Sequence, residues 1–242
     1  MNWDDVVQKV TPYLVKIDTP SGSGTGFLLS YNDDHSWCGI ATALHVVSIA
    51  DSWQQLIKIH SHDFLKTAFL TVEQRAIFTD YATDSAVIFF PSGQLDLPND
   101  LIPIRPIDTR LNIGTEVAWL GYPAIEAWTL CFFSGNVSAR RDDQKAYLID
   151  GVAINGVSGG PVINSTATDG VQFVGVMTAY RANRATGDAL PGLSIAQDVS
   201  HFHGVIQHIR SVDEANRKKR ELEAAAAKNL DVLPVDKVTP AE

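Results

Sequence analysis

The chain has 242 residues, of which 45% are hydrophobic and 19% are charged, and its formal net charge is −9. This composition is typical of a globular protein that buries a substantial core, and it excludes an intrinsically disordered chain. The acidic balance argues against a nucleic-acid partner, because a nucleic-acid backbone favours a concentrated basic surface.

The first residues do not resemble a targeting signal. The segment 1–5 is acidic and no apolar stretch follows it, unlike a secretory signal. No stretch approaches the roughly 18 uncharged apolar residues of a membrane span, and the best candidate, 115–133, is interrupted by charges, glycine and proline. We therefore expect a cytoplasmic protein without a membrane span, in which Cys38 and Cys131 stay reduced as buried thiols.

In chain order, the first predicted element is a short amphipathic helix over 1–12, because Trp3, Val6 and Val10 recur at helical spacing. Short apolar runs separated by Gly, Asn, Asp and Pro follow, and this pattern is typical of an all-β barrel or sandwich. We expect two β units, 13–98 and 99–198, because the segment between their strands is rich in turn-forming residues.

The pattern changes after residue 198. Four apolar residues between 202 and 209 lie on one face of a predicted helix over 199–228, which we expect to pack on the β units. From residue 213 this helix is rich in charges and alanine and has little to bury, so we expect it to be solvated there. Residues 229–242 are predicted to form a flexible tail.

A glycine-rich loop at 155–161, Asn-Gly-Val-Ser-Gly-Gly-Pro, contains the first candidate for chemistry. Glycines on both sides of Ser158 allow a sharp turn and let a substrate approach main-chain N–H groups without meeting a Cβ. The N–H groups of Gly156 and Ser158 are candidate donors to an oxyanion on a substrate carbonyl. By itself, such a loop fits a hairpin with a solvent-facing serine equally well.

Two other stretches decide between these interpretations. His45 stands at the end of the predicted strand 40–47, and Asp84 comes shortly before the predicted strand 86–90. Each residue alone fits a packing histidine or a turn aspartate. The chain order His45, Asp84, Ser158, however, is the order of the chymotrypsin-type triad.

These motifs give the chain a resemblance to the chymotrypsin/trypsin-like serine peptidases, and most of all to the bacterial Deg-type (heat-shock protease) branch. The resemblance covers about residues 13–212 and rests on the segments GSGTGFLLS, IATALHVV, TDSAVI, IDGVAINGVSGGPVIN, FVGVMTAY and GLSIAQDV. It implies two six-stranded antiparallel β-barrels and a C-terminal helix, with the active site in the cleft between the barrels.

The catalytic roles of the family fall on single residues of this chain. Ser158 matches the nucleophile, His45 the general base and acid, and Asp84 the group that orients the imidazole. Gly156 and Ser158 match the donors of the oxyanion hole. The resemblance implies hydrolysis of protein or peptide substrates through an acyl-enzyme, with no metal and no cofactor.

Three departures from the family change what is expected. Val157 stands where secreted trypsin-like enzymes have an aspartate that pairs with a newly cut N-terminus, so activation by N-terminal cleavage is not expected. We expect no PDZ domain of the Deg type. The disulfides of secreted relatives are also missing, which is consistent with a reducing compartment.

The specificity pocket is expected to carry no charge. Val152 matches the pocket floor with Ala153 beside it, and Thr178, Ala179 and Tyr180 match the strand that walls the pocket. Because a buried cation without a partner is costly, cleavage after Lys or Arg is not expected. We expect a preference for an uncharged, small to medium apolar residue before the scissile bond.

Two other functions remain open from the sequence. The run GVSGG also fits the nucleophile elbow of α/β-hydrolases, an esterase interpretation that requires strand–turn–helix around Ser158. The other alternative is a catalytically silent, protease-like module that binds a partner, because Val157 and Tyr180 are compatible with an unformed site.

Two histidine pairs and the charged helix complete the candidates. His60 with His62, or His201 with His203, could hold a metal, but neither pair has a nearby cysteine or a regular ligand set, so packing or exposed histidines are expected. A peptidase that is always active would threaten its own cell. We therefore expect a regulatory protein partner or a narrow substrate range, with the helix at 213–228 as a docking element.

Overall fold

The computed structural model describes residues 2–183 and 190–230, with side chains described for 2–179 and 192–224. The α-helices are α1 (Trp3–Val10), α2 (Leu44–Ser52) and α3 (Ser200–Leu230), and the short 3-10 helices are η1 (Thr11–Tyr13), η2 (Val72–Gln74), η3 (Ser92–Gln94), η4 (Ala124–Glu126) and η5 (Asp142–Gln144). The strands are β1 (Leu14–Thr19), β2 (Gly22–Tyr31), β3 (Trp37–Ala43), β4 (Ile57–Ser61), β5 (Thr67–Leu70), β6 (Ala76–Asp80), β7 (Ser85–Pro91), β8 (Glu116–Gly121), β9 (Cys131–Arg141), β10 (Ala146–Asp150), β11 (Pro161–Thr166), β12 (Gly170–Asn183) and β13 (Leu190–Asp198).

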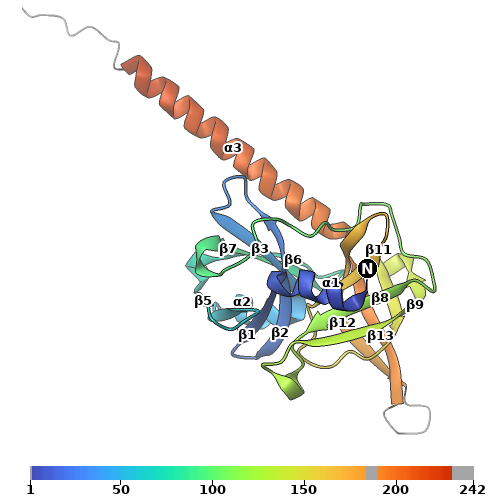
Figure 1. Cartoon of the computed structure of the whole chain (residues 1–242). Coiled ribbons are helices and arrows are strands. Elements are labelled where there is room, and N and C mark those ends of the chain that lie inside the picture. The colour runs from blue at the N-terminus through green and yellow to red at the C-terminus, as the bar shows by residue number, and fades with distance from the viewer. Residues whose placement is uncertain (1, 184–189, 231–242) are drawn as a thin grey trace, which may run out of the picture.

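These strands form two antiparallel sheets (Figure 1). A seven-stranded sheet has the order β5-β4-β1-β2-β3-β7-β6, and a closed six-stranded barrel has the order β10-β13-β12-β11-β8-β9. The all-β architecture of two barrel-like units with a C-terminal helix is therefore confirmed. The first unit differs from the expected six-stranded barrel, because it has seven strands and is an open half-barrel.

The first sheet stays open between β5 and β6, where η2 separates the two strands and a buried arginine binds the backbone. Arg75 Nη1 donates to the carbonyls of Gln55 at 2.8 Å and Leu70 at 2.7 Å, and Nη2 donates to the carbonyl of Ala50 at 3.3 Å. These carbonyls satisfy much of a guanidinium group that is removed from water. The loop between β5 and β6 is therefore tied to the end of α2.

One hydrophobic core takes side chains from both sheets, and a second core fills the closed barrel. Phe27 on β2 packs against Phe173 on β12 with ring centroids 4.6 Å apart, and against Phe202 on α3 at 6.4 Å. Val6 and Val10 of α1 belong to the same core. Because one close-packed core takes side chains from both sheets and both terminal helices, the position of one sheet relative to the other is fixed.

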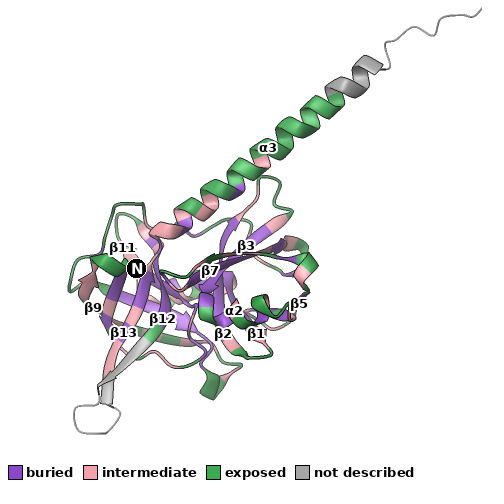
Figure 2. Cartoon of the chain, turned by 180° about the vertical axis from the view of Figure 1, so that it is seen from behind, coloured by how far each residue is buried: buried purple, intermediate pink, exposed green. Residues whose placement is uncertain are grey.

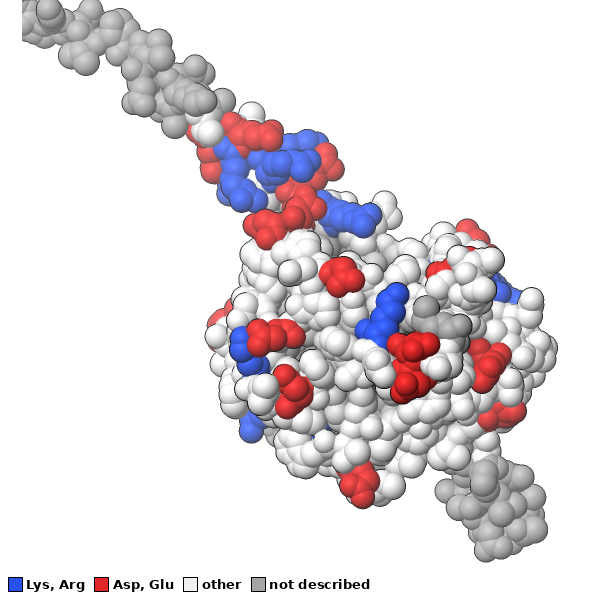
Figure 3. Space-filling view, in the orientation of Figure 1, with Lys and Arg blue, Asp and Glu red and all other residues white. Residues whose placement is uncertain are grey.

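Only the first part of α3 is packed. Phe202 and Ile209 are buried, whereas the described residues 214–224 are all exposed (Figure 2). This part projects away from the sheets (Figure 1) and carries charges of both signs side by side (Figure 3). One pair, Lys218 with Glu214, lies one turn apart at 2.7 Å, and such pairs support a solvated helix. Most of the predicted tail, 231–242, lies outside the described residues.

The described residues bear on the expected absence of a membrane span and on the expected reduced cysteines. None of their helices has both the length and the apolar character that crossing a bilayer requires. Cys38 is buried, Cys131 is partly buried, and both are free thiols. Burial raises the pKa of the Cys38 thiol to about 12, so this cysteine is a packing residue and no nucleophile.

Candidate active site

Asp84 holds both the backbone and the ring of His45. His45 lies in the first turn of α2, and Asp84 lies in the turn between β6 and β7. Asp84 Oδ1 accepts from the His45 backbone N–H at 3.0 Å, and Asp84 Oδ2 contacts His45 Nδ1 at 2.7 Å. Because a carboxylate only accepts, Nδ1 is the donor in this contact, and a neutral imidazole ring then has Nε2 as its acceptor.

The local backbone explains this arrangement. The N-cap residue of α2, Ala43, has no side-chain acceptor for the first N–H groups of the helix, so the carboxylate of Asp84 serves as a cap from another segment. The carbonyl of Asp84 also accepts from Leu44 N–H at 2.9 Å. Asp84 has a φ of 48°, a left-handed conformation that aspartate adopts more readily than most residues.

The loop that carries Ser158 turns at two glycines with left-handed backbone. Gly156 has a φ of 94° and Gly159 a φ of 86°. A Cβ on Gly156 would lie 2.4 Å from the carbonyl oxygen of Tyr122, and a Cβ on Gly159 would lie 2.1 Å from that of Thr25. Both positions therefore require glycine, for conformation and for space.

Backbone hydrogen bonds fix the peptide groups on either side of the serine. The carbonyl of Asn155 accepts from Ala124 N–H at 2.6 Å, and the carbonyl of Val157 accepts from Gly160 N–H at 2.9 Å. In a trans peptide the N–H points opposite to the carbonyl, so the N–H groups of Gly156 and Ser158 point away from these partners. Across the described residues, neither N–H group has an acceptor. A pair of unpaired, fixed N–H donors can bind an oxyanion.

His45 and the serine loop meet at one open cavity of about 410 Å³, which Asp84 does not line. His45, Gly156 and Ser158 line it, together with the 21–23 hairpin, α2 and the segment after β8. The side chain of His45 is 47% exposed, and Ser158 is partly exposed. Within the described chain, the His45 ring hydrogen-bonds only Asp84, and His45 lines the accessible cavity.

The sequence matches a known family over this region. Residues 24–176, more than half of the chain, match the family described as the trypsin-like peptidase domain. The chain belongs to this family. No curated protein matches the sequence.

Solved structures of bacterial proteases share the fold of this trypsin-like peptidase. The serine endoprotease from Yersinia pestis is 21% identical, with a TM-score of 0.63 over 86% of this chain and 66% of that chain. The inactive form of the Rv3671c protease is also 21% identical, with a TM-score of 0.59 over 84% and 92% of the two chains, and an inactive serine-to-alanine mutant of Rv3671c from M. tuberculosis gives 0.58. The present chain spans slightly less than two thirds of the Yersinia endoprotease.

The α/β-hydrolase interpretation of this peptidase is wrong. Ser158 is followed by the strand β11, whereas a nucleophile elbow leads into a helix. The paired strands are also antiparallel throughout both sheets, whereas that fold requires a largely parallel sheet.

The residues expected to form the specificity pocket lie in the loop before Ser158 and on β12. Val152 is 43% exposed, and Ala153 is partly buried against the core of the closed barrel. Thr178 is buried and donates to the carbonyl of Ile195 at 3.3 Å, and Ala179 is exposed. The side chain of Tyr180 lies outside the described residues.

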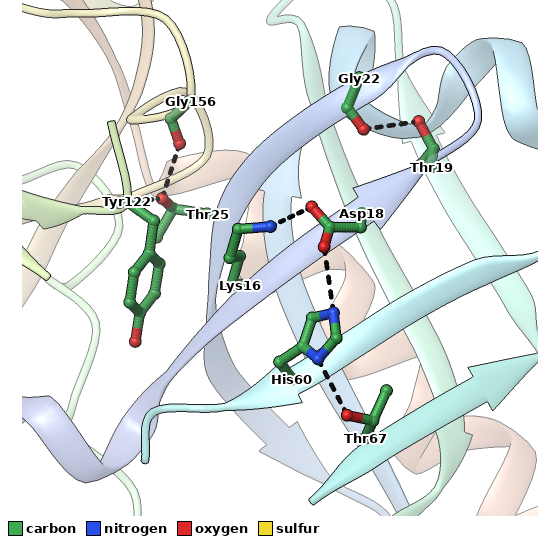
Figure 4. Close-up of polar contacts among 9 residues, drawn as sticks. All are labelled: Lys16, Asp18, Thr19, Gly22, Thr25, His60, Thr67, Tyr122 and Gly156. Carbon is green, nitrogen blue, oxygen red and sulfur yellow. Dashed lines mark hydrogen bonds and ion pairs between the residues drawn. The ribbon is translucent and has the colours of Figure 1, made fainter. Parts of the chain in front are cut away.

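The histidine pairs are not brought together as metal sites. His60 contacts Asp18 at 3.1 Å and Thr67 at 2.9 Å (Figure 4), and His203 contacts the carbonyl of Arg105 at 2.8 Å. His201 is largely buried beside Phe202. In the described ranges, no group of three His, Cys, Asp or Glu side chains is placed to hold a metal ion.

Two residues next to the serine loop were missed from the sequence. Thr25 donates to the carbonyl of Gly156 at 2.9 Å and accepts from the N–H of Tyr122 at 3.0 Å (Figure 4). The sequence signal for Thr25 was its place in the GSGTG hairpin, which the resemblance includes without giving this residue a role. Tyr122 carried no signal, because its contact with the loop is made by its backbone.

Proposed function

We propose that this trypsin-like peptidase is a serine endopeptidase that cleaves peptide bonds through Ser158, His45 and Asp84. The observation that carries the proposal is the 2.7 Å contact of Asp84 with His45, beside Ser158 and the unpaired N–H of Gly156 in one cavity. These are the groups that acyl transfer requires: a hydroxyl, an oriented base and oxyanion donors.

The reaction follows from the chemistry of these groups. His45 Nε2 takes the proton of Ser158 Oγ as that oxygen bonds to the substrate carbonyl carbon. The N–H groups of Gly156 and Ser158 hold the negative charge on the carbonyl oxygen, and Asp84 stabilises the imidazolium. His45 then gives the proton to the leaving amine as the C–N bond breaks. Water then attacks the ester carbonyl as His45 takes its proton, and His45 returns that proton to Ser158 Oγ as the C–Oγ bond breaks and the acid product leaves.

We infer a preference for an uncharged, small to medium apolar residue before the scissile bond. The support is the absence of an acidic side chain at Val152 and Ala153, which leaves a buried Lys or Arg without a counter-charge. Digestion of a peptide library, followed by mass spectrometry, tests the inference. Cleavage mainly after Arg or Lys would contradict it.

Labelling with a fluorophosphonate probe tests the function itself. We expect the native chain to be labelled and to cleave a casein or peptide-library substrate, and the Ser158→Ala variant to do neither. Ser138→Ala, which removes an exposed serine on β9 outside the cavity, is the matched control and keeps both activities. A native chain without Ser158-dependent labelling would support the silent, partner-binding module instead.

We also propose that a protein partner regulates the peptidase in the cytoplasm by contacting α3 over residues 213–228. The support is the exposure of residues 214–224 and their charges of both signs (Figure 3), which offer a surface that the fold itself does not need. Truncation of α3 tests this proposal, as described in the Discussion.

A further inference from the structure

Thr25 lies at the junction of the two sheets and is completely buried. It belongs to β2 of the first sheet, yet three of its hydrogen bonds are with the second half of the chain. Its N–H donates to the carbonyl of Ser158 at 2.8 Å. Its hydroxyl donates to the carbonyl of Gly156 at 2.9 Å and accepts from Tyr122 N–H at 3.0 Å.

A further hydrogen bond of Thr25 joins it to the strand that precedes His45. Thr42 Oγ1 donates to the carbonyl of Thr25 at 2.7 Å, and Thr42 is three residues before His45 on β3. Thr25 therefore contacts both β3, which leads to His45, and the loop of Ser158. The distance between these two segments affects proton transfer from Ser158 to His45.

The hydroxyl of Thr25 also reaches the second oxyanion donor indirectly. Tyr122 N–H binds Thr25 Oγ1, and two residues later Ala124 N–H binds the carbonyl of Asn155 at 2.6 Å. The Asn155 carbonyl and the Gly156 N–H belong to the same peptide group. One hydroxyl therefore ties down the segment after β8 and the carbonyl of Gly156 (Figure 4).

Thr25 is closely packed against the segment after β8 and against the serine loop, so the loop has few alternative positions while the Thr25 hydroxyl is present. A Cβ on Gly121 would lie 2.9 Å from Thr25 Oγ1, and a Cβ on Gly159 would lie 2.1 Å from the Thr25 carbonyl oxygen. Without the hydroxyl, Tyr122 N–H and the Gly156 carbonyl would both lack a partner in a buried place. Such groups favour a rearranged loop that restores their hydrogen bonds.

We propose that Thr25 is a positioning residue for the oxyanion hole: its hydroxyl bridges Tyr122 and Gly156 and so aims the Gly156 N–H at the substrate carbonyl. The proposal rests on the proposed peptidase function. Thr25 touches no reacting atom, so its effect on the reaction passes through the loop.

Kinetics of Thr25→Val and Thr25→Ser test the proposal. Valine keeps the shape and removes the hydroxyl, and we expect kcat to fall about 10- to 100-fold with KM changed less than about threefold. Thr25→Ser keeps the hydroxyl and restores kcat to within about threefold of the native value. Ser61→Ala removes another buried, hydrogen-bonded hydroxyl, from β4, and controls for a general loss of stability.

A second measurement does not depend on activity. In Thr25→Val, hydrogen exchange should accelerate in a peptide that covers 121–124, because Tyr122 N–H loses its acceptor, while Ser61→Ala leaves this peptide unchanged. Native kcat in Thr25→Val, or unchanged exchange at 121–124, would overturn the proposal. A native chain with no Ser158-dependent activity would instead overturn the proposed function, and this inference with it.

Discussion

At the scale of single residues, the site depends on backbone conformations that most residues avoid. Asp84, Gly156 and Gly159 all have positive φ, and each lies next to a group assigned to the chemistry. Such conformations persist only where the surrounding contacts determine them. Here the determining contacts are the bonds of Asp84 to the start of α2 and the packing of the serine loop against Thr25 and Tyr122.

Asp84→Asn should test how the Asp84 carboxylate orients the His45 ring without changing the packing, because the amide keeps the size of the carboxyl group. An amide nitrogen facing His45 Nδ1 favours the wrong tautomer, with the proton on Nε2. We expect kcat to fall about 10⁴-fold with little change in KM, measured by steady-state hydrolysis of a fluorogenic peptide. Asp143→Asn, at an exposed position in η5, should leave kcat unchanged. Near-native kcat in Asp84→Asn would contradict the role of Asp84.

Gly159→Ala should be far more destabilising than Gly170→Ala. Both glycines have positive φ, 86° and 69°, so both substitutions strain the backbone. Only at Gly159 would the new Cβ meet backbone, 2.1 Å from the Thr25 oxygen, whereas nothing lies within 4 Å at Gly170. In urea unfolding we expect a loss of about 1 kcal/mol for Gly170→Ala and about 3 kcal/mol or more for Gly159→Ala. Equal losses of unfolding free energy in the two variants would show that the steric overlap of the Gly159 Cβ with the Thr25 oxygen does not decide the cost.

At the scale of elements, α3 has two parts with different roles. Its first turns complete the core through Phe202, whereas residues 214–224 are exposed. The contact of Arg217 with Asp33, at 3.7 Å, joins two exposed side chains, and such pairs contribute little.

Ending the chain after Asp213 should therefore leave the fold intact. We expect the free energy of unfolding to change by less than about 1 kcal/mol, against a loss of about 3–5 kcal/mol for Phe202→Ala, both from chemical denaturation. Hydrolysis of a small peptide should also be unchanged, while association with the proposed partner is lost. A truncated chain that retains every association of the full chain would contradict docking at 213–228.

The first turn of α3 should make stability depend on acid pH. Burial lowers the pKa of His201 to about 4, against the opposing effect of Asp80 and Asp198 and with a small contribution from Lys145. Between about pH 6.5 and about pH 4, His201 is protonated in the unfolded chain but stays neutral in the folded chain. The free energy of unfolding therefore falls as the pH drops through this range.

The loss assigned to His201 is at most about 3 kcal/mol. His201→Leu should flatten the decline between pH 6.5 and 4 in thermal unfolding. His208→Leu, at an exposed position on the same helix, should not. An unchanged pH dependence in His201→Leu would assign the decline to other groups.

At the scale of the whole molecule, the cavity at the candidate site lies between two sheets that are joined by a core to which both contribute. Phe27 contributes to that core from the first sheet and Phe173 from the second, 4.6 Å apart. The proposed triad is divided in the same way, since His45 and Asp84 belong to the first unit and Ser158 to the second. The core therefore sets the distance between base and nucleophile.

The two sheets should unfold together in one calorimetric transition. Phe173→Ala should lower stability by about 3–5 kcal/mol and lower kcat as well, because the cleft loses its packing support. Phe69→Ala, which removes an exposed ring on β5, should change neither. Two separate transitions in the native chain would show that the sheets fold independently.

The sequence alone determined the fold class and the three candidate side chains, because these signals are local. Turn residues mark short strands, and Ser158, His45 and Asp84 each lie in a motif of a few residues. The sequence did not predict α2. Residues 44–47 of this helix were predicted as the end of the strand 40–47, because a short apolar run fits a helix or a strand. The sequence also missed the strand β6 and the open edge at Arg75.

Only the tertiary structure decided how the serine loop is held. The hydroxyl of Thr25 binds backbone groups 97 and 131 residues away, and Asp84 caps a helix that begins 40 residues earlier in the chain. Backbone N–H and carbonyl groups are the same at every residue, so no residue type marks them as partners. Their pairing depends on where the two sheets meet, and that is set by the packing of the shared core.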